Sequence, residues 1–128
     1  MRTEYSVKID SVYGTDELPV KDEIRVKDFT SFSQVEELVK SGAEFKPEWL
    51  AVLTVHNEKS ENTEYSVFVF RTDDGEMFYT SSESLLESLM DIIELKDRLN
   101  SSGEPWAVVI NEFKSKNNTG SFYKAVLV

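Results

Sequence analysis

The sequence contains no cysteine, and this absence removes several classes of chemistry. It excludes disulfide bonds, thiolate metal ligands and cysteine nucleophiles, and it is typical of proteins in a reducing compartment. Histidine occurs once, so a metal centre or a catalytic triad would depend on His56 alone, at the end of a predicted strand. We therefore predict no catalytic residue, no metal site and no cofactor, and expect a binding protein rather than an enzyme.

Glycine and long apolar runs are scarce as well. With only five glycines, the chain has no glycine-rich phosphate loop, which excludes a P-loop nucleotide hydrolase. No stretch approaches the roughly 20 apolar residues that cross a bilayer, and the first residues lack the apolar segment of a signal peptide. We therefore expect a soluble cytoplasmic protein that has no membrane partner.

Positive charge is the next shortage. The chain has 14 basic and 24 acidic residues, a net charge of -10. Residues 105–128 contain one acidic residue and three lysines, a net +2, so residues 1–104 supply -10 - 2 = -12. The acidic part repels polyanions at long range and favours a basic partner protein. The last segment is the one locally basic element.

Hydrophobic periodicity divides the first 48 residues into three predicted elements. Residues 3–13 alternate between apolar and polar side chains and predict a strand, and residues 23–29 predict a second, shorter one. Residues 31–42 combine a serine cap, an apolar stripe and a terminal Gly42, which predicts a short amphipathic helix. We interpret residues 1–48 as an N-terminal extension of a single domain that covers 1–128.

The remaining residues predict five strands and one long helix. The strands are predicted at 49–57, 65–71, 76–80, 106–114 and 121–128, with the helix at 82–99. A helix between strands three and four is the element order of an OB-fold, so 49–128 is predicted to form a five-stranded antiparallel barrel with the helix plugging one end. The alternative is another α+β domain with an antiparallel sheet of six or seven strands.

Aromatic residues are the main candidates for a binding site. They make up 12% of the chain and concentrate in the predicted strands, where several alternate with basic residues. Single-strand binders stack bases on such rings and hold phosphates with cations. The alternative is that the long helix covers one face of the sheet and the N-terminal region the other, so that the rings form the core. The predicted nucleic-acid-binding residues are Phe68, Phe70, Arg71, Trp106, Phe113, Lys114, Lys116, Asn117, Tyr123 and Lys124.

Two segments also carry a family resemblance. GEMFYTSSESLLESLMDIIE and PWAVVINEFKSKNNTGSFYKAVLV together resemble small phage-encoded single-stranded-DNA-binding proteins of Gram-positive hosts. In those proteins a strand leads into a capped helix and then into a final hairpin with a lysine-rich, glycine-containing turn. The resemblance implies an OB-fold and a role in phage or mobile-element DNA replication or recombination, in the host cytoplasm.

Three functional hypotheses remain open from the sequence. The first is a non-catalytic binder of single-stranded DNA that uses the C-terminal hairpin. The second is an acidic protein-interaction or inhibitor module whose N-terminal half binds a basic partner protein. The third is an enzyme with no local motif. The sequence leaves the oligomeric state open, including a dimer, and does not separate DNA from RNA.

Overall fold

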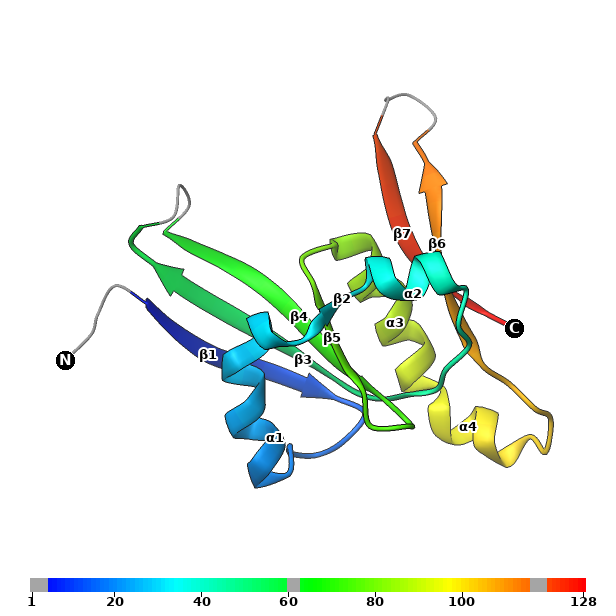
Figure 1. The fold of residues 1–128 in the computed structure, drawn as a ribbon. Coiled ribbons are helices and arrows are strands. Elements are labelled where there is room, and N and C mark those ends of the chain that lie inside the picture. Colours follow the sequence, from blue (N-terminus) through cyan, green and yellow to red (C-terminus); the bar gives the residue numbers. More distant parts are fainter. Residues whose placement is uncertain (1–4, 60–62, 116–119) are drawn as a thin grey trace.

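The computed structural model describes residues 5–59, 63–115 and 120–128 and shows a mixed α+β fold (Figure 1). The elements along the chain are β1 (Tyr5–Tyr13), α1 (Val20–Arg25), the 3-10 helix η1 (Val26–Ser31), β2 (Ser33–Gln34), α2 (Glu36–Ser41), β3 (Pro47–Asn57), β4 (Glu64–Thr72), β5 (Met77–Thr80), α3 (Glu83–Glu94), α4 (Lys96–Ser101), β6 (Val108–Lys114) and β7 (Ser121–Leu127). Within these ranges, no helix has the length and apolar character needed to cross a bilayer.

Five strands form one open sheet in the order β1-β3-β4-β5-β2, and β6 and β7 form a separate hairpin. The β1–β3, β3–β4 and β4–β5 pairs are antiparallel, whereas β2 pairs with β5 in parallel. The strands predicted at 49–57, 65–71 and 76–80 are confirmed as β3, β4 and β5. The segment before residue 47 supplies both edge strands of the sheet, β1 and β2.

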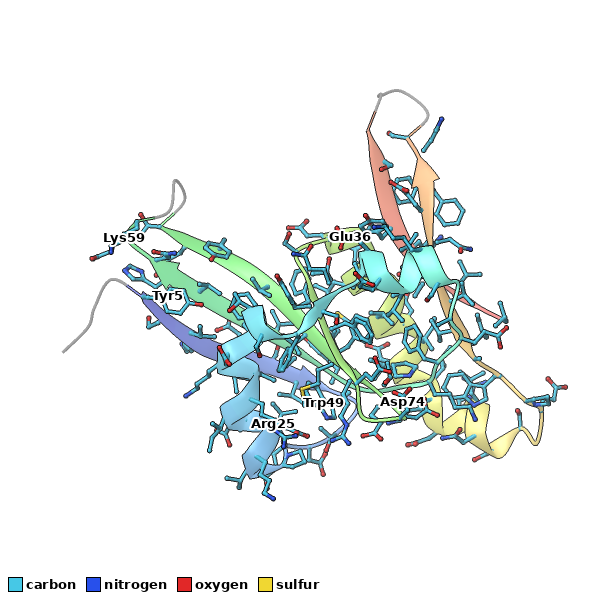
Figure 2. All side chains as sticks on the ribbon, in the orientation of Figure 1. Tyr5, Arg25, Glu36, Trp49, Lys59 and Asp74 are labelled. Atoms are coloured by element: carbon cyan, nitrogen blue, oxygen red, sulfur yellow. The ribbon has the colours of Figure 1, made fainter. Side chains whose placement is uncertain are left out.

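Both faces of the five-stranded sheet are covered by other elements. Phe68 and Phe70 of β4 pack toward α2 and α3, whereas Val67 and Val69 pack in a second cluster that includes Val26 and Phe29 of η1. Trp49 of β3, labelled in Figure 2, belongs to that second cluster. The alternative in which the long helix and the N-terminal region each cover one face is therefore confirmed for the five-stranded sheet and its rings Phe68 and Phe70.

The barrel predicted over 49–128 is not found among the described residues. Only one bridge, between Phe45 and Val108, connects the hairpin to the segment that leads into β3. At Lys46 the backbone turns away from β6, because its N–H donates to the Asp73 carboxylate and its carbonyl accepts from the Asp73 N–H. Pro47 then has no N–H to donate. Backbone pairing between the hairpin and the segment that leads into β3 is therefore limited to the Phe45–Val108 bridge in the described residues.

The strand predicted at 23–29 is wrong. This segment forms the end of α1 and most of η1, and its buried side chains follow a helical spacing rather than alternation. Asp22, Val26 and Phe29 are buried, at intervals of four and three residues, while Ile24 is 69% exposed. The alternation between Ile24 and Val26 is therefore accidental, because a helix places these two residues on different faces.

The long predicted helix is present but is broken into α3 and α4. Ser82 caps α3 by accepting the Leu85 N–H at 3.3 Å. Leu89 of α3 packs in the hydrophobic core. At Leu95 the backbone leaves the helical region, with φ -97° and ψ 2°. The turn lets Lys96 donate to the Glu48 carbonyl at 2.8 Å, which attaches the helix to the start of β3.

The turn between β4 and β5 contains Asp74–Gly75, a dipeptide that favours a tight hairpin between two strands. Gly75 has a φ of +91°, and its N–H donates to the Thr72 carbonyl at 3.0 Å. Hydrogen bonds to the Asp74 carboxylate lower the pKa of Asp74 below its usual value, because they stabilise the charged form. The largest effect comes from the Thr72 hydroxyl and the next from the backbone N–H of Glu76. The turn is held by its own hydrogen bonds, so it requires no bound cation.

Gly14 follows β1 at a point where only glycine fits, which gives a prediction for stability. Its φ is +92°, and a Cβ there would lie 2.6 Å from the Glu48 carbonyl oxygen. Gly42 has a φ of +64° and open space around it, so it is a matched control. Gly42→Ala should lower the free energy of unfolding by about 1–2 kcal/mol, because alanine is strained in the left-handed backbone conformation. Gly14→Ala should lower it clearly more, because the added Cβ also meets the Glu48 carbonyl oxygen. Urea unfolding measures both, and equal losses would contradict the close packing at Gly14.

Candidate functional site

Three of the aromatic residues predicted to bind nucleic acid belong to the core. Phe70 has no exposed surface, and Phe68 and Trp106 are 3% and 8% exposed. The Phe70 ring stacks on Phe45 and Phe78, with centroids 5.6 and 5.7 Å away. The Trp106 indole N–H donates to the Asn100 side-chain oxygen at 3.0 Å. These rings are covered in the folded protein, so a nucleotide base has no access to them.

Arg71 is occupied by ion pairs within the protein. Its guanidinium donates to the buried carboxylate of Asp22 at 3.1 Å and lies 3.7 Å from the carboxylate of Glu48. Asp22 is only 2% exposed, and Arg71 supplies its shortest ion pair. The arginine therefore connects β4 to α1, and a phosphate would have to compete with two carboxylates for it.

The other predicted residues that the structure describes lie on the β6–β7 hairpin, which projects from the rest of the molecule (Figure 1). Phe113 and Phe122 are cross-strand partners. Their rings stack with centroids 5.7 Å apart and planes at 25°, and they are 38% and 39% exposed. An exposed aromatic pair of this kind keeps one apolar surface in contact with water, which is the surface that a base or an apolar side chain would cover.

Two lysines accompany the stacked rings. Lys124 lies two residues beyond Phe122 on the same face of the hairpin, opposite Asn111, and it is exposed. Lys114 is also exposed and follows Phe113 on the other face. We call Asn111, Phe113, Lys114, Phe122 and Lys124 the hairpin surface. The predicted Lys116 and Asn117 lie outside the described residues.

Tyr123 is placed differently from its neighbours. It is half-buried on the opposite face from Phe122, and it packs against the core cluster. Partial desolvation, and then the negative charges of Glu36 and Glu112, raise the pKa of the Tyr123 phenol. The ring is therefore neutral at physiological pH and belongs to the base of the hairpin rather than to the hairpin surface.

Helix α3 and the segment before β3 anchor the base of the hairpin. The Ser88 hydroxyl accepts the Ala125 N–H at 2.9 Å, and the Ser84 hydroxyl donates to the Tyr123 carbonyl at 2.9 Å. On the other side, Val108 exchanges two backbone hydrogen bonds with Phe45, at 2.7 and 3.0 Å. These bonds attach the start of β6 and the end of β7 to the body of the protein.

An acidic wall limits the approach to the hairpin surface from one side. Phe122 and Lys124 border a groove of about 320 Å³ whose other wall, on α3, includes Glu87 and Asp91. A phosphate chain in this groove would meet two carboxylates, whereas Phe113 and Lys114, which do not line the groove, are exposed. Phe122 is not among the predicted site residues, and the acidic wall was not predicted either. Ser84 and Ser88, four residues apart on one face of α3, are the residues that bond to β7, and this small polar pair is the signal in the sequence that could have indicated the contact.

Metal coordination gains no support from the part of the chain that the structure describes. Among the described residues, no three histidine, aspartate or glutamate side chains form a group that could hold a metal ion. His56 lies 3.4 Å from the Glu64 carboxylate and 3.7 Å from that of Glu58, so it is a partly exposed side chain beside two carboxylates. No protein-family model, no curated protein and no solved structure matches this chain.

Proposed function

We propose that this protein binds single-stranded DNA through the hairpin surface and does not chemically transform it. The observation that carries the proposal is the stacked pair Phe113–Phe122, which is exposed to solvent and accompanied by two exposed lysines. A base can stack on such a ring, and a lysine can pair with the adjoining phosphate. The proposal does not depend on a closed barrel, because all of these residues lie on one hairpin.

The charge of the protein sets the expected mode of binding. The net charge of -10 and the acidic wall on α3 repel a phosphate chain from most of the surface. Binding is therefore confined to the hairpin, with few phosphate contacts and a large share of stacking. We place this activity in the cytoplasm and, following the resemblance to phage single-strand binders, in DNA replication or recombination of a phage or mobile element.

The stacking contribution can be tested with fluorescence anisotropy of labelled oligothymidylate. Phe113→Ala and Phe122→Ala should each weaken binding by about 1–3 kcal/mol, because each removes one stacking ring. Phe113→Leu is the matched control, since leucine keeps an apolar side chain but has no aromatic face. If Phe113→Leu binds as well as the parent, the contact is not stacking. If the parent binds no oligonucleotide at low salt, the proposal is wrong and an acidic protein-interaction module takes its place.

The phosphate contribution gives a separate prediction. Two lysine–phosphate contacts on a single strand give a slope of about -1.4 when the logarithm of the binding constant is plotted against the logarithm of the salt concentration, since each contact contributes roughly -0.7. Replacing Lys114 and Lys124 with alanine should weaken binding and bring the slope close to zero. Lys8→Ala with Lys21→Ala changes the net charge equally at exposed sites on β1 and α1. An equal loss in that control would show that total charge, rather than the hairpin, controls the affinity.

A further inference from the structure

β1 is an edge strand of the five-stranded sheet, paired with β3 on one side. It has nine residues, each of them at least partly exposed, whereas most residues of β3 are buried. In the part of the chain that the structure describes, no strand pairs with its other side. An edge of this length presents alternate backbone N–H and C=O groups, to which an extended segment can add as a further strand.

A groove of about 320 Å³ runs beside this edge. Residues 9–12 of β1 form one wall, and the loop after β1 together with the start of α1 forms the other. The facing wall carries the carboxylates of Asp16, Glu17 and Glu23, whereas the carboxylate of Asp10, on the strand, accepts the Thr54 hydroxyl. No lysine or arginine is among the described residues that line it. A segment in this groove would be favoured if it carried positive charge.

The strand has a bulge that divides its edge into two parts. The register with β3 shifts between Ile9 and Ser11, which leaves Asp10 without a residue opposite it in the β3 ladder, although its carboxylate accepts the Thr54 hydroxyl. Bulges bend and twist an edge strand and reduce uncontrolled pairing with other chains. Residues 5–9 therefore offer the regular stretch for backbone pairing. The acidic groove begins where that stretch ends.

We propose that the β1 edge binds an extended, lysine- or arginine-bearing segment of a partner protein. The segment pairs with the backbone of residues 5–9 and places a cationic side chain in the groove lined by Asp16, Glu17 and Glu23. Nucleic acid is a poor occupant, because its phosphates would meet carboxylates and it has no strand backbone. A second copy of this chain would bring its own acidic groove to the interface, so a basic partner fits better. This surface is independent of the hairpin surface.

A synthetic nine-residue peptide of alternating lysine and threonine, blocked at both ends, is a suitable probe. Calorimetry should detect its binding, and hydrogen exchange of the amides of residues 5–13 should slow in the complex. The same peptide with glutamate in place of lysine should not bind. Asp16→Asn, Glu17→Gln and Glu23→Gln together should weaken binding by about tenfold. Glu37→Gln, Glu44→Gln and Glu83→Gln remove equal charge from exposed sites elsewhere and should leave the affinity nearly unchanged.

Two further peptides separate strand pairing from charge attraction. One carries N-methyl groups on its lysine amides and the other on its threonine amides, so each loses the hydrogen-bond donors of one edge. Because an added strand pairs through alternate residues, one peptide should bind about tenfold more weakly and the other like the parent. Strand addition is overturned if both bind like the parent, or if the charge-matched control loses as much affinity as the groove variant. Either result leaves the oligonucleotide experiments on the hairpin unaffected.

Discussion

Phe70→Ala is expected to lower the free energy of unfolding by about 3–5 kcal/mol, the usual cost of removing a buried phenylalanine ring. Phe70 has no exposed surface and stacks on Phe45 and Phe78, so its removal leaves a cavity between two rings that the sheet and helices hold in place. Such a cavity closes poorly, because its walls belong to three different segments of the chain. Urea unfolding followed by circular dichroism measures the change.

Phe113→Ala is the matched control for this experiment. It makes the same substitution in another strand, but the ring is 38% exposed and contacts mainly Phe122. We expect a loss of about 1 kcal/mol or less, the size of an exposed cross-strand aromatic pair. A loss at Phe113 as large as that at Phe70 would contradict the assignment of Phe113 to an accessible surface, and with it the proposed stacking site.

Arg71→Met is expected to destabilise the protein by about 3–5 kcal/mol, because it leaves the buried Asp22 carboxylate without its closest cation. The carboxylate is 2% exposed and lies 3.1 Å from the guanidinium, which joins α1 to β4. Methionine keeps much of the volume of the side chain, so packing loss contributes little. The measurement is again urea unfolding, with oligothymidylate binding measured at a temperature where the variant is folded.

Two variants show whether the cost comes from the buried pair. Arg25 also approaches Asp22, at 3.7 Å, but its side chain is 60% exposed, so Arg25→Met should cost about 1 kcal/mol or less. The double variant Asp22→Leu with Arg71→Met removes both charges and should recover much of the loss. A stable Arg71→Met variant that loses oligonucleotide binding would instead restore Arg71 to the binding site.

Local sequence patterns were sufficient for most of the second half of the chain. The β-branched and aromatic runs of β3, β4, β6 and β7 and the Asp74–Gly75 turn predict elements that the structure contains. In these segments, residues close in sequence determine the backbone conformation. The same reasoning failed at 23–29, where Val26 and Phe29 are buried by β-sheet residues such as Trp49 that lie far away in the sequence.

Exposure of the aromatic residues was beyond the reach of local patterns. Phe70 and Phe113 both lie in strands rich in apolar residues, and nothing within several residues of either shows which one is covered. Phe70 is buried because Phe45, Phe78 and α3 pack on that face of the sheet. Phe113 is exposed because the hairpin extends beyond α3. Whether a predicted aromatic site residue is buried or exposed therefore depends on contacts between distant segments of the chain.

The sequence by itself determined the strands from residue 49 onward, the Asp74–Gly75 turn, the absence of cysteine and the acidity of the first 104 residues, since these depend on composition and on neighbours along the chain. Only the tertiary structure decided that β6 and β7 form a hairpin separate from the five-stranded sheet and that Arg71 forms an ion pair with Asp22. It also decided that β1 is an edge strand beside a groove lined by carboxylates. The physical reason is that strand pairing, ion pairing and burial each require a partner, and here that partner comes from a distant segment of the chain.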